Sequence, residues 1–171
     1  MIFLYVLVSV LFLVCFFDYR HRKIPNSLII LLFLSGVIQS YLFARTAQSV
    51  VFYLLKCILV LIGTYPLFRI GTLGAGDSKL FAVSFAYLPL KEGILFLIVS
   101  FGIAAIFSIL KIIIAQNGRE RLYYLVSYVS EVIRSGQWSL YIQNEKSDKS
   151  ATVCLSGPVF LSILLHMGNV Y

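Results

Sequence analysis

The sequence predicts an all-α membrane protein, a polytopic bundle of about six transmembrane helices with one amphipathic helix at the membrane surface. Of its 171 residues, 60% are hydrophobic and only 12% are charged, about half the charged fraction of a typical soluble domain. Apolar runs of bilayer-spanning length recur along the chain. They lack the alternation of barrel strands, and open strands leave backbone groups unsatisfied in lipid, so the runs are predicted to be helices.

Six apolar segments are expected to form the spans: 1–17, 27–43, 50–68, 78–90, 93–115 and 151–167. The first lacks the preceding positive charge and the following cleavage site of a signal peptide, so it is expected to be retained. The fourth is short, because Pro89 and Lys91 interrupt it. Counting it as a span places most Lys and Arg residues on one side, which the positive-inside rule assigns to the cytoplasm. The N-terminus is then expected outside.

The remaining features fit a single membrane domain over residues 1–171. Residues 119–142 carry apolar side chains at helical spacing and are predicted to lie on the cytoplasmic surface, followed by a polar linker over 143–150. The net charge of +7 comes from cations that flank the apolar runs, which indicates membrane topology and argues against a nucleic-acid partner. The three cysteines lie in apolar segments without CxxC spacing, which indicates small buried hydrophobic residues and not metal ligands or disulfides. Neither a metal nor a cofactor is expected.

Two of the seven acidic residues occupy unusual positions. The other five fall in predicted loops or on the surface helix, where solvation accounts for them. Asp18 directly ends the first apolar run, and Asp77 opens the fourth after a glycine-rich stretch that begins at Gly71. The predicted topology places both at the cytoplasmic side. Two neighbouring carboxylates share a proton, so one can activate water as a base while the other donates as an acid.

Each aspartate also has a simpler explanation. Asp18 could belong to a solvated loop with local ion pairs, and Asp77 could cap a helix after a flexible turn, since aspartate is favoured at that position. The glycines could instead hold a substrate strand through backbone hydrogen bonds. A phosphate-binding loop is excluded, because Asp77-Ser78 stands where Lys-Ser or Lys-Thr is required.

The two aspartate motifs together resemble those of the bacterial type IV prepilin peptidases, which are membrane aspartic proteases of the Gly-x-Gly-Asp type. Asp18, followed by Ile24-Pro25-Asn26, is similar to the first motif, and Gly74-Ala75-Gly76-Asp77-Ser78-Lys79 is similar to the second. The resemblance covers nearly the whole chain, and two predicted spans separate the motifs, as in that family.

The resemblance implies an enzyme that removes basic leader peptides from prepilins and pilin-like secretion subunits at the cytoplasmic face of the bacterial inner membrane. It implies that Asp18 and Asp77 are the catalytic pair and that Ile24-Pro25-Asn26 shapes the turn into the second helix. Gly74, Ala75, Gly76 and Lys79 would then surround the site.

Two departures from the family pattern qualify this expectation. The larger members carry an additional cytoplasmic region with paired cysteine motifs and methylate the new N-terminus. The present sequence starts at the first apolar run, so it resembles the short, protease-only branch associated with Flp-type pili, and methyltransferase activity is not expected. In the last span only Ser156-Gly157-Pro158 remains of a Pro-Tyr-Gly-Pro-like motif.

The sequence is also compatible with two other functions. One is a small proton- or ion-coupled transporter that uses the two aspartates as relay groups. Such a protein needs polar residues near the bilayer midplane, where Lys56 is the main candidate, although its long side chain can also extend to the membrane surface. The other is an inert membrane scaffold, which would tolerate loss of both aspartates.

Overall fold

The computed structural model describes residues 2–114 and 154–168, which form six α-helices and no strand within those ranges. The helices are α1 (Ile2–His21), α2 (Asn26–Ala44), α3 (Ala47–Arg69), α4 (Ala75–Tyr87), α5 (Leu90–Ile114) and α7 (Ser156–Met167). The prediction of an all-α bundle is therefore confirmed. The predicted surface helix 119–142 and linker 143–150 lie outside the described residues.

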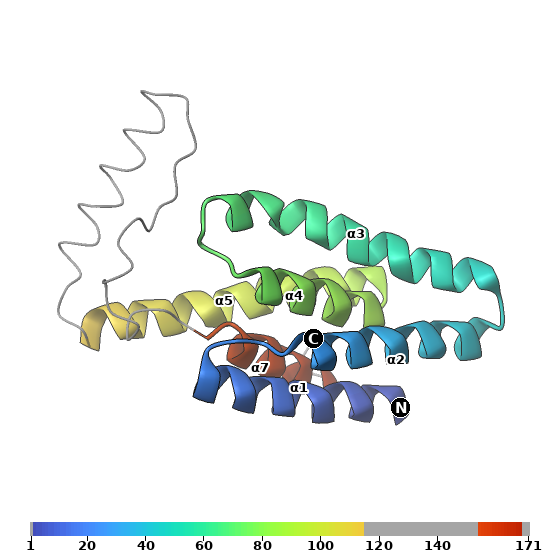
Figure 1. Cartoon of the computed structure of the whole chain (residues 1–171), viewed down its shortest axis with the longest axis horizontal. Helices are drawn as coiled ribbons and strands as arrows, with labels where there is room; N and C mark the ends of the chain where they lie inside the picture. Colours follow the sequence, from blue (N-terminus) through green and yellow to red (C-terminus); the bar gives the residue numbers. More distant parts are fainter. Residues whose placement is uncertain (1, 115–153, 169–171) are drawn as a thin grey trace, which may run out of the picture.

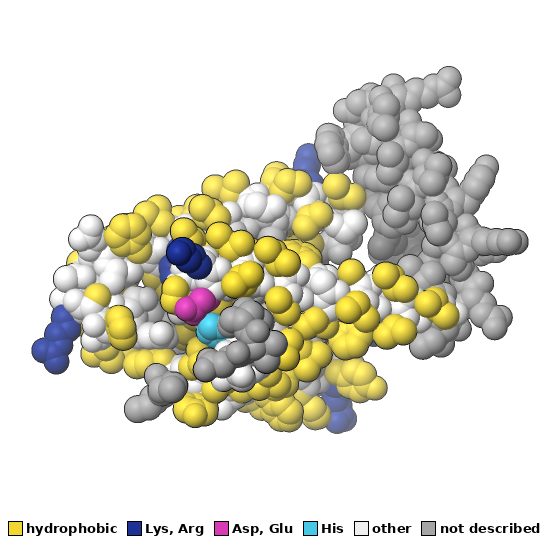
Figure 2. Space-filling model, turned by 180° about the vertical axis from the view of Figure 1, so that it is seen from behind, with side chains coloured by type: hydrophobic (Ala, Val, Ile, Leu, Met, Phe, Trp, Pro, Cys, Tyr) yellow, Lys and Arg dark blue, Asp and Glu magenta, His cyan; other side chains and the backbone are white. Residues whose placement is uncertain are grey.

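Four of these helices, α1, α2, α3 and α5, are long and apolar enough to cross a membrane. Much of their apolar surface faces outward, as in Phe43, which is 92% exposed, and Ile62, which is 67% exposed. Hydrophobic side chains likewise cover most of the face shown in Figure 2. Lipid is the solvent that such a surface requires. The protein is a multi-pass membrane protein, and the count of six spans stays a prediction.

Helix α4 occupies the interior of the bundle. Every residue from Leu80 to Leu88 is buried, and the helix packs against α2, α3, α5 and α7. Figure 1 shows α4 in green between α3 and α2. With 13 residues, α4 is about 20 Å long, which is shorter than the roughly 30 Å hydrocarbon core of a bilayer. One of its ends must therefore lie among apolar groups.

Lys56 satisfies the C-terminal end of α4. Its ammonium group donates hydrogen bonds to the carbonyl oxygens of Ala86 and Leu88, at 2.7 and 2.8 Å. The last carbonyls of a helix have no intrahelical partner, and they are costly to leave unsatisfied in an apolar environment. Lys56 thus reaches inward to α4 instead of extending to the membrane surface.

Aromatic side chains fill the core around α4. Tyr53, Phe81, Phe85 and Phe96 are among the largest fully buried residues. Helices α2 and α3 approach closely where Gly36 faces the Tyr53 ring, because any Cβ at Gly36 would overlap that ring. This contact brings the middle of α2 close to α3.

Candidate active site

Asp18 lies in the last turn of α1. The helix extends to His21, four residues beyond the predicted end at residue 17. It closes at Arg22, whose backbone N–H donates to the Asp18 carbonyl at 2.8 Å and whose φ of 51° is left-handed, as is common just after a helix end. Asp18 is only 7% exposed. The aspartate therefore projects from a helix into the protein, and the solvated-loop alternative does not hold.

Asp77 lies in the first turn of α4. The helix begins at Ala75, three residues earlier than predicted, with Gly74 as its N-cap. The Asp77 carboxylate accepts a hydrogen bond from the Gly74 backbone, as an acidic residue does in a capping box. A Cβ added at Gly74 would lie 2.7 Å from Asp77 Oδ2. Asp77 is thus the third residue of the helix, and the absent side chain at Gly74 gives its carboxylate the space it occupies.

The negative charge of Asp18 acts on Asp77. Asp77 precedes the apolar part of α4 and lies outside the four spanning helices. Burial, and then the negative charge of Asp18, raise the pKa of Asp77 from 3.8 to about 6, against the lowering effect of the Gly74 hydrogen bond. Two negative charges repel each other more strongly when little water separates them. The ends of α1 and α4 therefore bring Asp18 and Asp77 together, as the sequence predicts.

The two sequence motifs also pack against each other. Ile24 lies over Gly76, and a Cβ added at Gly76 would be 3.2 Å from Ile24 Cβ. Pro25, with φ of −64°, is the N-cap of α2 and directs the chain into that helix. Ala75 and Gly76 are already helical, so the flexible part of the glycine-rich stretch is shorter than expected. Of its glycines, Gly71 has a left-handed φ, at 79°.

Ser156 is a site residue that the sequence reasoning did not select. It is the first residue of α7 and is 1% exposed. Its Oγ donates a hydrogen bond to Asp18 Oδ2 at 2.5 Å. Because an uncompensated buried carboxylate is costly, this bond both stabilises and orients Asp18. The signal available in the sequence was the short Ser156-Gly157-Pro158 remnant, in which proline fits the first turn of a helix.

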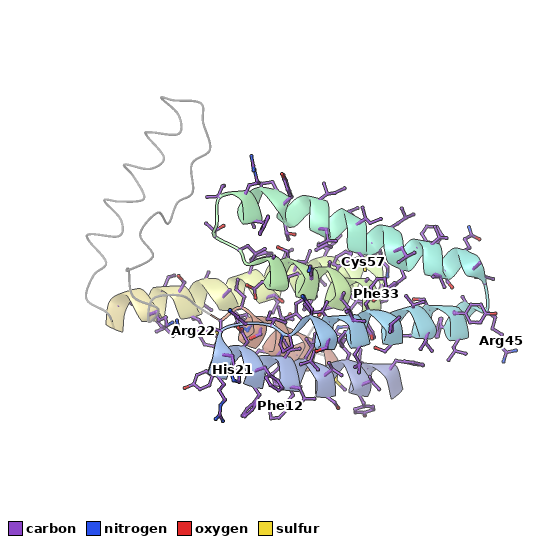
Figure 3. All side chains as sticks on the ribbon, in the orientation of Figure 1. Phe12, His21, Arg22, Phe33, Arg45 and Cys57 are labelled. Carbon is purple, nitrogen blue, oxygen red and sulfur yellow. The ribbon has the colours of Figure 1, made fainter. Side chains whose placement is uncertain are left out.

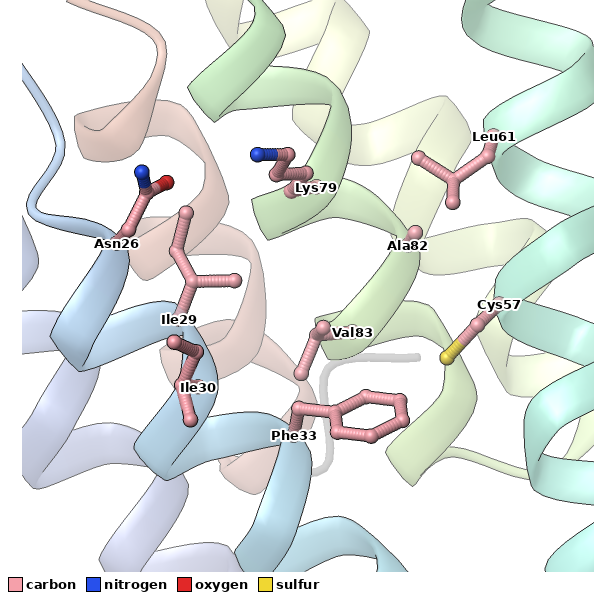
Figure 4. Close-up of a pocket in the computed structure, with 9 residues that line it drawn as sticks. All are labelled: Asn26, Ile29, Ile30, Phe33, Cys57, Leu61, Lys79, Ala82 and Val83. Carbon is pink, nitrogen blue, oxygen red and sulfur yellow. The ribbon is translucent and has the colours of Figure 1, made fainter.

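Two residues of the predicted site line a cavity. Asn26 and Lys79 line a cavity of about 420 Å³ between α2, α3 and α4 (Figure 4). Lys79 follows Asp77 by two residues in α4, so their side chains project about 200° apart around the helix axis. Lys79 is therefore directed away from Asp77, while Gly74 contacts the Asp77 carboxylate and Ile24 packs on Gly76.

Within residues 2–114 and 154–168, no group of three or more His, Cys, Asp or Glu side chains could hold a metal ion. A mechanism without metal or cofactor stays a prediction. The chemistry that the described residues offer is proton transfer between two carboxyl groups, one of which has a pKa of about 6.

The fold and the site define a class, namely multi-pass membrane proteins with a pair of interacting carboxyl groups at one end of a helix bundle. The family model of the type IV leader peptidases matches residues 5–109, a range that includes Asp18, Ile24, Pro25 and Asp77. The chain belongs to the type IV leader peptidase family. No curated protein and no solved structure gives a significant match. Ser156 lies beyond the matched range.

Proposed function

We propose that this protein is an aspartic endopeptidase that removes the basic leader peptide from prepilins or pilin-like precursors. The observation that carries the proposal is the proximity of Asp18 and Asp77. Burial and the negative charge of Asp18 together raise the pKa of Asp77 to about 6. Membership of the type IV leader peptidase family supports a peptidase. A pair of carboxyl groups that shares one proton is suited to hydrolysing a peptide bond.

In the proposed mechanism, Asp18 is the base and Asp77 carries the shared proton. Asp18, oriented by Ser156, accepts a proton from the attacking water, and the resulting hydroxide equivalent adds to the scissile carbonyl carbon. Asp77 donates its proton to the carbonyl oxygen as the tetrahedral intermediate forms. The intermediate collapses when the C–N bond breaks and the proton on Asp18 passes to the leaving amine. The hydroxyl proton of the intermediate returns to Asp77, so both carboxyl groups regain their starting states.

The charge distribution supports a site that faces the cytoplasm of a bacterial inner membrane. Arg22 and Arg45 lie at opposite ends of the bundle (Figure 3). The end with Arg22 also holds most of the described cations, namely Arg20, Lys23, Arg69, Lys79 and Lys111. The positive-inside rule assigns this end to the cytoplasm. In this orientation, Asp18 and Asp77 face the compartment in which precursors are made.

The transporter alternative has less support. Lys56, the polar residue considered for a midplane relay, is bound to the carbonyl groups that end α4. This contact gives Lys56 a role in the fold. The aspartates lie at one end of the bundle, where a proton relay through the membrane would need further polar partners deeper inside.

Co-expression with a tagged prepilin from the same genome tests the proposed function. We expect the wild type to convert the precursor to a shorter product on a gel, and mass spectrometry to place the new N-terminus after the basic leader. A variant with both Asp18→Asn and Asp77→Asn, present at the same level in the membrane, serves as the inactive control. Equal processing by the wild type and this variant would exclude the aspartate pair as the catalyst.

Replacing Ser156 with alanine is expected to reduce cleavage by about 10- to 100-fold, because a hydrogen bond to a charged group contributes roughly 1.5–3 kcal/mol. The matched control is Ser162→Ala. Ser162 is also buried in α7, but its Oγ donates to the Phe96 carbonyl at 3.1 Å. Both variants lose a buried hydroxyl, and only Ser156→Ala changes the surroundings of Asp18. Similar kcat/KM values for the two variants would contradict a role for Ser156 in orienting Asp18.

A further inference from the structure

The cavity between α2, α3 and α4 has no part in the proposed hydrolysis. Its volume is about 420 Å³, within the range of small-molecule binding sites. Most of its lining is apolar or weakly polar: Ile29, Ile30, Phe33, Cys57, Leu61, Ala82 and Val83. Figure 4 shows Asn26 and Lys79 together at one end, with the Lys79 side chain extending from α4 toward α2. The cavity is therefore amphipathic, with its polar groups at a single end.

The cavity lies between two membrane-spanning helices. Its lining includes Ile30, which is 57% exposed, and Leu61, which is 39% exposed, and both belong to helices long and apolar enough to cross a membrane. From Asn26 to Phe33 the cavity follows α2 for about 10 Å. Beyond Phe33, the contact between Gly36 and Tyr53 closes the space between α2 and α3. A chain-like apolar ligand can thus enter from the bilayer and lie along α4.

The helical geometry separates this cavity from the paired carboxylates. Lys79 follows Asp77 by two residues in α4, so their side chains project about 200° apart around the helix axis. A peptide bond held between Asp18 and Asp77 therefore lies on the other side of α4 from the cavity. This placement favours a lipid over the peptide substrate as the occupant.

The polar end of the cavity has donors without partners. Lys79 and Asn26 are exposed side chains, and they make no hydrogen bond or ion pair with any other residue in the described ranges. The three acidic groups of those ranges have other surroundings. Glu92 is 3.3 Å from His166, Asp18 accepts from Ser156, and Asp77 accepts from the Gly74 backbone. An ammonium and an amide at the end of an apolar cavity match a phosphodiester attached to an acyl chain.

We propose that this cavity binds an anionic phospholipid of the phosphatidylglycerol type. Lys79 and Asn26 bind the phosphate, and one acyl chain lies between α2 and α3 against Ala82 and Val83. Lys79 then has its function at the lipid headgroup, apart from the carboxylate pair. The inference does not depend on the proposed peptidase activity.

Native mass spectrometry of the full-length protein in mild detergent tests the proposal, with phosphatidylglycerol or phosphatidylcholine added at equal concentration. We expect the wild type to retain phosphatidylglycerol preferentially. Lys79→Gln should lower that retention about fivefold, the factor that corresponds to roughly 1 kcal/mol for one lysine at an anionic lipid. Ile30→Trp, which fills the cavity and keeps Lys79, should also lower it. Inorganic phosphate in excess should leave the bound lipid in place.

The control is Lys91→Gln, since Lys91 is an exposed lysine in the first turn of α5 and does not line the cavity. It should retain phosphatidylglycerol as the wild type does, and circular dichroism should show that all variants are folded. Equal retention of both lipids, or equal losses in Lys79→Gln and Lys91→Gln, would overturn the proposal in favour of annular lipid only. Displacement by inorganic phosphate, or normal retention by Ile30→Trp, would leave a simple anion site and also overturn it.

Discussion

Replacing Asp77 with asparagine is expected to lower kcat/KM by about 10²- to 10⁴-fold, the usual contribution of a general acid or base, while making the folded protein more stable at neutral pH. Asparagine retains the size of the side chain but cannot transfer the proton. It also removes the partly buried negative charge that Asp77 carries beside Asp18 above pH 6. Activity and stability should therefore change in opposite directions.

The pH dependence of stability follows from the raised pKa. Folded Asp77 has a pKa of about 6, against 3.8 for the unfolded chain, so the folded state binds the proton more tightly. The stability that this proton contributes is fully present below pH 4 and is lost as the pH rises through about 6, with a cost of up to about 3 kcal/mol. Thermal unfolding in detergent should show Asp77→Asn melting above the wild type at pH 7.5, with a smaller difference at pH 4.5. The same Tm difference at both pH values would show that the ionisation of Asp77 does not limit stability.

Replacing Gly74 with alanine is expected to reduce kcat by roughly 100-fold, because misplacing a catalytic group by about 1 Å can have an effect of that size. The backbone of Gly74, at φ −72° and ψ 150°, is accessible to any residue. The restriction comes instead from Asp77, whose Oδ2 would lie 2.7 Å from the new Cβ. The carboxylate must therefore move away from the Gly74 backbone. Cleavage of the precursor under single-turnover conditions measures the effect.

Gly63→Ala is the matched control for this experiment. Gly63 lies within α3, and a Cβ added there meets nothing within 4 Å, so kcat should stay near the wild-type value. The circular dichroism spectrum of Gly74→Ala should remain helical, since alanine is accommodated by the backbone. A Gly74→Ala variant with normal kcat would mean that Asp77 does not act from the position it occupies in this structure.

The sequence predicts the long helices well, because their apolar runs are longer than those that a soluble fold would expose. It is less informative for α4, which is short and is buried by its neighbours rather than by lipid. The sequence also predicts the helix ends near the two aspartates less accurately. Asp18 and Asp77 were predicted at the junctions of helices and loops, yet each lies within a helical turn. Polar residues continue these helices because capping and tertiary contacts outweigh the local loss of hydrophobicity.

Contacts between distant segments account for what the sequence could not predict. Ser156 lies 138 residues after Asp18, and nothing in its local sequence identifies that carboxylate as its partner. Lys56 carries a charge inside an apolar run, and only the position of α4 shows which carbonyl oxygens it binds. Lys79 belongs to the second motif in sequence, but the helix directs it to the opposite side from Asp77. In each case, the position of the residue in the sequence does not indicate which groups its side chain contacts.

The bond between Lys56 and the end of α4 has a consequence for where a substrate can be cut. Lys56 lies near the middle of α3, and α4 has about the same length as the stretch of α3 from Lys56 to Arg69. The start of α4, with Asp77, is therefore held level with the charged end of α3 and cannot slide along the membrane normal. Under the proposed function, a precursor anchored by its own apolar helix would present one particular peptide bond at this height. The fixed length of α4 would then set the distance between the membrane surface and the peptide bond that is cut.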